Sequence, residues 1–341
     1  MIKSSVLIIY TGGTIGMIRD FDTGALKVFN FKNLLDKIPE LKLLDCEIST
    51  ISFEEPLDSS NMQPAHWVKI CNIIKDNYEA YDGFVILHGS DTMSYTASAL
   101  SFMLENLSRP VILTGSQLPI GDLRTDAKEN LITSVQLAAL KGKNNRPVIN
   151  EVGLYFEYKL YRGNRTSKVS AEFFEAFASP NYPALVNSGL HLAIDHNALL
   201  PKSKKKFKIH ESMVPQVLVV HLYPGITQQM MECLVSNDVY KGVILLSFGT
   251  GNASTEPWFL EILKNIIVRG LPVANITQCT SGSVQMGNYE TSATLKKLGI
   301  IDGKDLTIEA AITKMMYLLG QNLSSKVFKT IFETPLRGEM L

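Results

Sequence analysis

Three short apolar runs in the first 120 residues each end in a turn of glycine and hydroxyl residues. Residues 5–10 lead into TGGTIGM, residues 84–88 lead into HGSDTM, and residues 110–113 lead into TGSQ. Runs this short and this rich in β-branched residues predict buried strands rather than helices. Because the carboxyl ends of parallel strands share one edge of a sheet, the three turns predict a polar crevice at that edge.

Helix-length segments separate these runs, which favours an α/β fold. Residues 64–81, 92–107 and 125–140 carry apolar side chains at helical spacing. Regular alternation of strands and helices is typical of a parallel sheet covered by helices. We therefore expect a larger N-terminal parallel-sheet domain, followed by a smaller C-terminal α/β domain.

The boundary between the two domains is predicted from a break in this alternation. At 341 residues the chain is longer than single hydrophobic cores usually support. Between residues 195 and 215 it holds five lysines and two prolines and few apolar residues, a composition typical of a solvated linker. We predict a catalytic α/β domain over residues 1–195, a linker over 196–215 and a C-terminal α/β domain over 216–341.

The charge balance points to a small-molecule ligand. The chain has 33 basic and 33 acidic residues and a formal net charge of zero, which argues against nucleic acid or an anionic membrane as the main partner. It has no apolar run of roughly eighteen residues, and its first strand begins too early for a signal sequence. We expect a cytoplasmic protein.

Motif spacing excludes several classes of site. The glycines of the first turn match neither the GxGxxG fingerprint nor a phosphate-binding P-loop. The six histidines are scattered without metal-ligand spacing, so a metal is not implied. The four cysteines form no CxxC pair and are expected to be reduced thiols.

A hydroxyl nucleophile in such a crevice needs a base, because free threonine and serine are weak nucleophiles near neutral pH. Lys168 is a candidate, since a partly desolvated lysine held by Asp91 could accept a proton from the hydroxyl of Ser90. The residues therefore suggest a Ser90–Lys168–Asp91 relay. A plain surface lysine at position 168 is the alternative.

These motifs together resemble the asparaginases of the bacterial cytoplasmic type I class. TGGTIGM at 11–17 and HGSDTM at 88–93 carry the resemblance. Supporting segments run nearly from end to end and lie at residues 57–62, 98–107, 114–119, 161–168, 277–282 and 305–310. The resemblance implies a hydrolase that converts L-asparagine to L-aspartate and ammonia without a cofactor.

The resemblance also implies roles for individual residues. Thr14 would be the nucleophile that attacks the side-chain amide and carries the acyl-enzyme. Ser90, Asp91 and Lys168 would form a second polar relay, and Asp91 would also hold the α-amino group of the substrate. The backbone amides of the glycine turns would form the oxyanion hole.

The resemblance implies that Ser59 and Ser60 bind the α-carboxylate of the substrate. The family forms homodimers, often paired into homotetramers, with active sites between subunits, and Asn252 would be the residue that reaches across. The resemblance leaves open whether this chain is a dimer or a tetramer, and whether asparagine also acts as an allosteric activator.

Two departures from the family pattern concern the catalytic groups. Ser90 replaces the usual threonine of the second motif, so the hydroxyl is kept but the methyl group that restricts χ1 is lost. Ala25 stands where many members have a tyrosine next to the nucleophile. Tyr289 is our candidate for its replacement, and an exposed loop tyrosine is the alternative.

Two other functions compete with asparagine hydrolysis. A related amidase could act on glutamine or supply ammonia to a transferase partner. A non-catalytic amino-acid sensor could keep the crevice and lose turnover through Ala25. The presence of Thr14, Ser90, Asp91 and Lys168 together argues against the sensor, because binding alone does not require a nucleophile.

Overall fold

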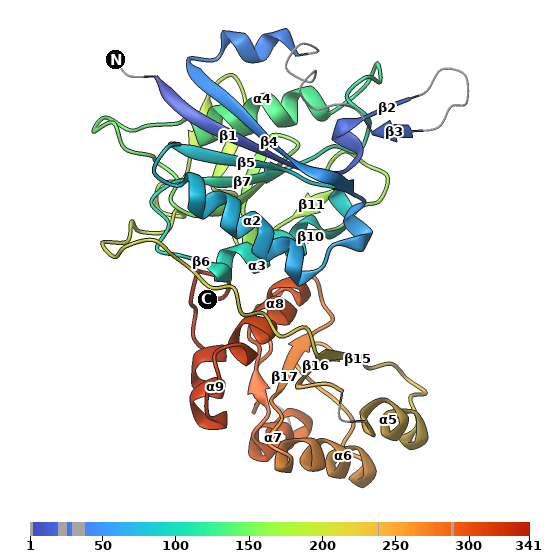
Figure 1. Ribbon diagram of the computed structural model, residues 1–341. Helices are drawn as coiled ribbons and strands as arrows, with labels where there is room; N and C mark the ends of the chain where they lie inside the picture. The colour runs from blue at the N-terminus through green and yellow to red at the C-terminus, as the bar shows by residue number, and fades with distance from the viewer. Residues whose placement is uncertain (1–2, 20–25, 29–37, 238, 288–289) are drawn as a thin grey trace. The chain divides into compact units, whose positions relative to one another are not determined.

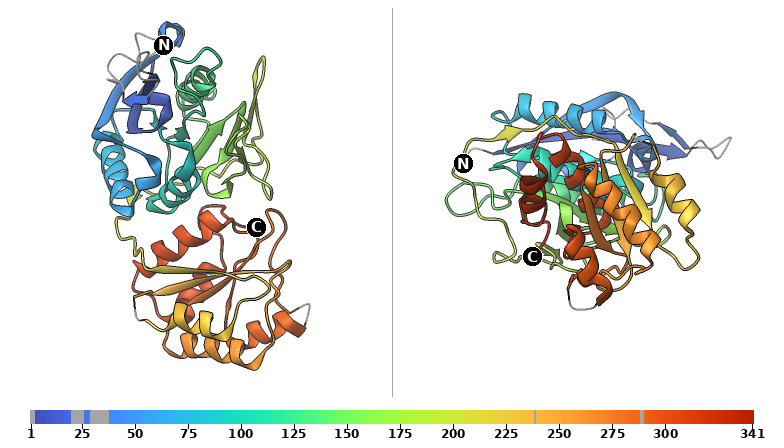
Figure 2. Two further views of the ribbon diagram at one scale, coloured as in Figure 1. Left: turned by 90° about the vertical axis from the view of Figure 1, so that its right-hand side faces the viewer. Right: turned by 90° about the horizontal axis from the view of Figure 1, so that it is seen from below.

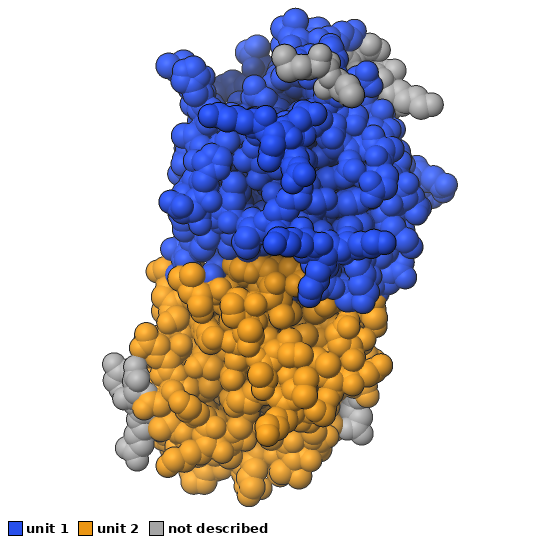
Figure 3. All heavy atoms as spheres, turned by 90° about the vertical axis from the view of Figure 1, so that its left-hand side faces the viewer, with its two compact units in different colours: residues 1–211 blue, residues 212–341 orange. Residues whose placement is uncertain are grey.

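The computed structural model describes residues 3–19, 26–28, 38–237, 239–287 and 290–341. The chain divides into two compact units, Met1–Glu211 and Ser212–Leu341, which are coloured separately in Figure 3. Each unit has its own sheet and its own helices (Figure 1). The larger first unit and the smaller second unit confirm the predicted α/β class.

An eight-stranded mixed sheet forms the centre of the first unit, in the order β13-β12-β9-β8-β7-β5-β1-β4. The strands from β4 to β8 run parallel, and the three at the other edge are antiparallel. Their bounds are β1 (Ser4–Gly12), β4 (Cys46–Leu57), β5 (Gly83–Leu87), β7 (Val111–Thr114), β8 (Val152–Phe156), β9 (Lys159–Arg162), β12 (Val186–Ser188) and β13 (Leu192–Ile194).

Helices cover both faces of this sheet (Figure 1). They are α2 (Pro64–Asn77), α3 (Met93–Met103) and α4 (Ala127–Ala138). Val6, Ile8 and Tyr10 of β1 share one buried cluster with residues of α4. The alternate residues of β1 point to the opposite face, since side chains alternate along a strand, and α2 and α3 lie on that side.

The register of the parallel strands brings the predicted polar turns to one edge. Tyr10, two residues before the end of β1, pairs with Leu87, the last residue of β5, and Leu87 pairs with Thr114, the last residue of β7. Three short elements follow β1, β4 and β5, and these are η1 (Thr14–Gly16), η4 (Ser59–Asn61) and η5 (Ser90–Thr92), respectively. Shared register is therefore the reason that turns far apart in sequence come together.

The described part of the first unit also contains several shorter elements. They are β2 (Met17–Arg19), β3 (Leu26–Val28), η3 (Pro39–Leu43), β6 (Leu104–Glu105), η6 (Gly163–Arg165), β10 (Ser167–Lys168), β11 (Phe177–Ala178) and β14 (Lys208–Ile209).

The lysine-rich stretch, expected from its composition to be a solvated linker, packs on the first unit over much of its length. β14 pairs with β6 in antiparallel fashion. The ring of Phe207 stacks on that of Tyr78, with centroids 3.8 Å apart. Nε2 of His210 lies 2.7 Å from Oε2 of Glu105. The change from one unit to the other falls after Glu211, within the predicted linker range.

The second unit contains a four-stranded parallel sheet in the order β15-β16-β17-β18, shown in Figure 2. Its strands are β15 (Val217–His221), β16 (Gly242–Ser247), β17 (Val273–Thr277) and β18 (Ile301–Asp302), and its helices are α5 (Gln228–Val235), α6 (Pro257–Val268), α7 (Glu290–Leu298), α8 (Ile308–Leu319) and α9 (Ser325–Phe332). Among the described residues, no helix is both long and apolar enough to cross a membrane.

Candidate active site

Two glycine bends are in direct backbone contact at the carboxyl edge of the first sheet. Gly13 has a φ of 91°, which glycine adopts without strain. A Cβ atom at this position would lie 2.5 Å from the backbone nitrogen of Gly89 and 2.6 Å from its Cα. Only glycine therefore allows this approach. Thr14 and Ser90 each follow directly after one of these two glycines, so both hydroxyl residues belong to the same small region.

The turn after β4 joins the same region through Ser59. A Cβ atom on Gly89 would lie 2.6 Å from the hydroxyl oxygen of Ser59, and the hydroxyl of Thr92 donates a hydrogen bond to the Ser59 carbonyl at 2.7 Å. Ser59 is buried, with 4% exposure. The close contact and the burial together place Ser59 beside the Gly89 bend.

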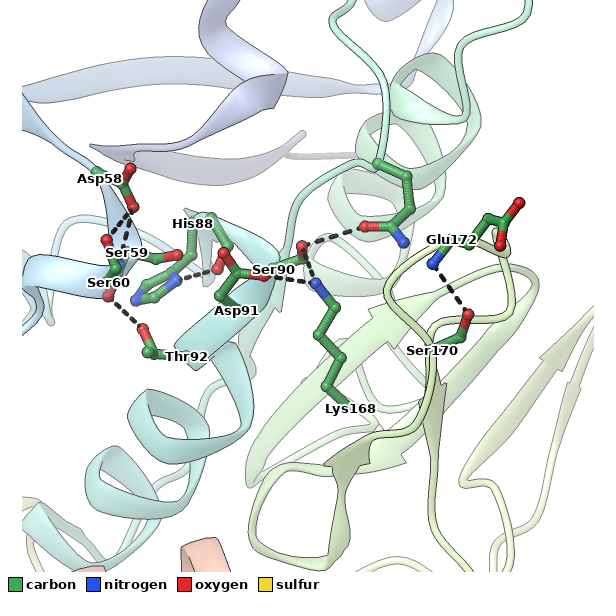
Figure 4. Close-up of polar contacts among 12 residues, drawn as sticks. Asp58, Ser59, Ser60, His88, Ser90, Asp91, Thr92, Lys168, Ser170 and Glu172 are labelled. Atoms are coloured by element: carbon green, nitrogen blue, oxygen red, sulfur yellow. Dashed lines mark hydrogen bonds and ion pairs between the residues drawn. The ribbon is translucent and has the colours of Figure 1, made fainter.

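Ser60, the neighbour of Ser59, is exposed and has a different partner. Its hydroxyl donates to Oδ1 of Asp58 at 2.7 Å, and its backbone N–H donates to the same oxygen at 2.9 Å (Figure 4). These hydrogen bonds lower the pKa of Asp58. Of the two serines predicted to bind the α-carboxylate, Ser59 is thus the one that contacts the glycine bend.

Ser90, Asp91 and Lys168 are brought together by the fold. Nζ of Lys168 lies 2.7 Å from Oδ1 of Asp91 and donates to Oγ of Ser90 at 2.8 Å (Figure 4). Lys168 lies on β10, which pairs with β11, and its side chain is 18% exposed, against 68% for Asp91. The contacts connect a hydroxyl, an ammonium group and a carboxylate in the order that a proton relay requires.

Gln117, which sequence reasoning did not select, also contacts Ser90. The hydroxyl of Ser90 donates to Oε1 of Gln117 at 3.2 Å, and Nε2 of Gln117 donates to the carbonyl of Phe173 at 3.1 Å. The backbone N–H of Gln117 donates to the buried carboxylate of Asp126, whose pKa is raised by burial. Its position in TGSQ, the third polar turn, was the available signal.

His88 forms a hydrogen bond with the second glycine bend. Its Nδ1 lies 2.7 Å from the carbonyl oxygen of Gly89, and its Nε2 lies 2.9 Å from Oγ1 of Thr96, which accepts a hydrogen bond from the Trp67 indole. Since a carbonyl only accepts, Nδ1 carries the proton. Burial lowers the pKa of His88 to about 4, so the ring is neutral near pH 7 and serves a structural role.

Thr14 opens η1 and is half-buried. The hydroxyl of Tyr10 lies against Gly16 in the same turn, but burial raises the pKa of Tyr10 to about 12, so this phenol stays protonated near neutral pH. Ala25 and Tyr289 both lie outside the described residues.

Asn252 belongs to the second unit and follows β16. Its backbone N–H donates to the carbonyl of Phe248 at 2.8 Å, which closes the turn 248–252. Among the residues that the structure describes, no group of three or more histidine, cysteine or acidic side chains could hold a metal ion.

Two known family models together match most of the chain. The family model "Asparaginase, N-terminal" matches residues 5–199, and "Glutaminase/Asparaginase C-terminal domain" matches residues 216–332. The chain belongs to the asparaginase family. L-asparaginase 1 of Escherichia coli is 44% identical over 342 residues, which cover 100% of this chain and 99% of that protein.

Two further relatives extend the comparison. The crystal structure of L-asparaginase I from Vibrio cholerae matches with a TM-score of 0.90 and 42% identity, covering 100% of both chains. The 60 kDa lysophospholipase of Mus musculus is 39% identical, over 98% of this chain and 62% of that longer protein. The first match supports the fold along the whole chain, and the second shows that the similarity extends beyond proteins named asparaginase.

Proposed function

We propose that this protein hydrolyses L-asparagine to L-aspartate and ammonia, with Thr14 as the nucleophile. The observation that carries the proposal is the contact between Gly13 and Gly89, which puts Thr14 beside the bend that holds Ser90 and Asp91. The similarity to proteins named L-asparaginase supports the choice of substrate.

In the proposed reaction, the hydroxyl oxygen of Thr14 attacks the side-chain amide carbon of asparagine. The backbone N–H groups of the glycine bends stabilise the negative oxygen of the tetrahedral intermediate. The C–N bond then breaks, the leaving nitrogen takes up the proton that the Thr14 hydroxyl lost and departs as ammonia, and an aspartyl ester remains on Thr14. A water molecule hydrolyses that ester, which releases aspartate and restores the hydroxyl.

The relay of Ser90, Asp91 and Lys168 would transfer protons and bind the substrate. Lys168, held by Asp91 at 2.7 Å, passes protons through the Ser90 hydroxyl. The carboxylate of Asp91 also binds the α-amino group of asparagine, and the Ser59 hydroxyl binds its α-carboxylate. Tyr289 is our candidate for the group that takes the proton from Thr14.

The site is proposed to be complete only in an assembly of at least two copies, in which Asn252 of one copy reaches the active site of another. Assembly as a dimer or a tetramer and a location in the cytoplasm both follow from the resemblance of the motifs. No metal and no cofactor takes part in the proposed reaction.

Ammonia release with asparagine and glutamine side by side tests this function. One extra methylene in a tight site costs about 1–3 kcal/mol, so we expect kcat/KM for asparagine to exceed that for glutamine by at least roughly tenfold. A preference for glutamine would favour the amidase alternative. The absence of ammonia release with either amide would favour the sensor and contradict the proposal.

A matched pair of lysine variants adds a control to that assay. Lys168→Met removes the ammonium group of the relay and should lower kcat by roughly 10²-fold or more. Lys159→Met changes an exposed lysine on β9 of the eight-stranded sheet and should leave the rate unchanged. Equal rates in the two variants would remove Lys168 from the mechanism.

A further inference from the structure

The second unit contains a cavity of about 470 Å³ at the amino ends of its four parallel strands. Residues just before or at the start of β15, β16, β17 and β18 line it, together with the end of α8 and the first turns of α9. The polar turns 249–252 and 280–282 follow the carboxyl ends of β16 and β17 instead. The cavity therefore lies at the opposite edge of the sheet from those turns.

The cavity has an apolar floor and apolar walls. Four of its lining side chains are at most 5% exposed, and these are Val273, Ile301, Leu318 and Phe328. Val214, Leu271, Leu319 and Leu323 are half-buried around them. A cavity of this volume with mostly apolar walls is typical of small-molecule sites.

Its charged groups are of one sign. Lys241 and Lys329 line the cavity, and no aspartate or glutamate does so among the described residues. The ammonium group of Lys329 donates to the carbonyls of Gly299 and Ile300 at 3.1 and 2.8 Å and lies 3.7 Å from a carboxylate oxygen of Glu333. Its donors are therefore already engaged by the protein.

Lys241 differs from Lys329, because its exposed ammonium group forms no ion pair with any described residue. A lysine combines an apolar stem with a charged end, which suits the rim of an apolar cavity. We propose that this cavity binds a small amphiphilic anion, a medium-chain fatty acid or a similar apolar carboxylate. The apolar body lies on the floor, and the carboxylate meets Lys241. Amide hydrolysis plays no part in this proposal.

Isothermal titration calorimetry of the full-length protein with octanoate tests the site. Octylamine, a cation of the same chain length, is the control ligand. We expect saturable binding of octanoate and none of octylamine. Lys241→Gln should raise the Kd for octanoate by roughly fivefold at low salt. Lys326→Gln should leave it unchanged, because Lys326 is an exposed lysine of α9 that does not line the cavity. Leu323→Trp, which fills the space, should abolish binding.

Three results would overturn this proposal. They are the absence of saturable octanoate binding, equal binding of octylamine, and a Kd that does not change in Lys241→Gln. A sedimentation coefficient altered by Leu323→Trp would instead show that the cavity is an interface between copies of this chain. Lys241 is exposed and its replacement is not expected to disturb folding, so that variant decides the question even if Leu323→Trp does not fold. Asparagine hydrolysis, measured alongside, should be unchanged in Lys241→Gln.

Discussion

Ser90 supplies the hydroxyl of the proposed Ser90–Asp91–Lys168 relay without the β-methyl group that would restrict its χ1 angle. In the structure its oxygen contacts Nζ of Lys168 at 2.8 Å and Oε1 of Gln117 at 3.2 Å. Gln117 is itself held by Phe173 and Asp126. We interpret Gln117 as a positioning residue that holds the Ser90 rotamer in place of the missing methyl group.

A double-mutant cycle tests this interpretation. Gln117→Ala should lower kcat for asparagine by roughly tenfold, because the hydroxyl of Ser90 is no longer held in one rotamer. In a Ser90→Thr background, where the added methyl group restricts χ1, the same change should cost clearly less. Steady-state kinetics of the four proteins supply the numbers.

Gln136→Ala is the matched control for this cycle, since Gln136 is exposed on α4. It should leave kcat unchanged in both backgrounds. Equal losses from Gln117→Ala with serine and with threonine at position 90 would show that Gln117 acts in some other way.

His88 makes the stability of the first unit depend on pH. Its pKa is lowered to about 4 in the folded protein, against an ordinary value of 6.5. As the pH falls below 6.5, the unfolded chain takes up a proton that the folded chain does not. The free energy of unfolding should therefore fall by about 2 kcal/mol between pH 8 and pH 5 from this side chain alone.

Urea unfolding at pH 8, 6.5 and 5 measures this effect. His88→Gln should flatten the pH dependence while lowering stability at pH 8, where the neutral ring is favourable. His196→Gln changes an exposed histidine and should keep the parent slope. An unchanged slope in His88→Gln would show that another group is responsible.

At the scale of elements, the lysine-rich segment 202–208 differs from a free linker. β14 pairs with β6, Asn106 donates to the carbonyl of Lys206 at 3.2 Å, and Phe207 stacks on Tyr78. These contacts hold the backbone of the segment against the first unit, although its lysine side chains are exposed.

Limited trypsin digestion distinguishes a held segment from a free one. We expect the intact protein to resist cleavage within 202–208 despite its lysines, because a protease needs a locally unfolded backbone. Phe207→Ala removes the stacked ring and should make this segment the first site cut. Rapid cleavage there in the parent protein, mapped by mass spectrometry, would contradict the packing described above.

The burial of a strand decided whether it could be predicted from the sequence. The runs at β1, β5, β7 and β8 are apolar throughout because both faces of these strands are covered. β4 was not predicted although it has 12 residues, because it lies at the sheet edge and most of its residues are half-exposed or exposed. β12 and β13 are three residues long and partly exposed, too short for a periodic signal.

The candidate site was partly predictable from the sequence for a related reason. Turns at the ends of buried parallel strands must share an edge, so Thr14 and Ser90 could be assigned to one region from the pattern alone. Lys168 lies 78 residues from Ser90 and could be proposed on chemical grounds but not from spacing. Gln117 and the hydrogen bonds of His88 were missed, because they depend on side-chain contacts across several elements.

At the scale of the whole molecule, the residues of the proposed site come from separate parts of the chain. The first turn contributes Thr14, the turn after β4 contributes Ser59, the second glycine bend contributes Ser90 and Asp91, and β10 contributes Lys168. Register within one sheet brings the first three together, and β10 reaches them through the contacts of Lys168. The site is therefore a property of the folded unit rather than of any single motif.

The most direct test of the account is the rate of asparagine hydrolysis by Thr14→Ala, compared with Thr14→Ser. If Thr14 is the nucleophile, the alanine variant should lose roughly 10³-fold or more in kcat, while the serine variant, which keeps an attacking hydroxyl, should lose far less. Circular dichroism should show both variants folded like the parent. A Thr14→Ala protein that releases ammonia from asparagine as fast as the parent would contradict the proposed mechanism.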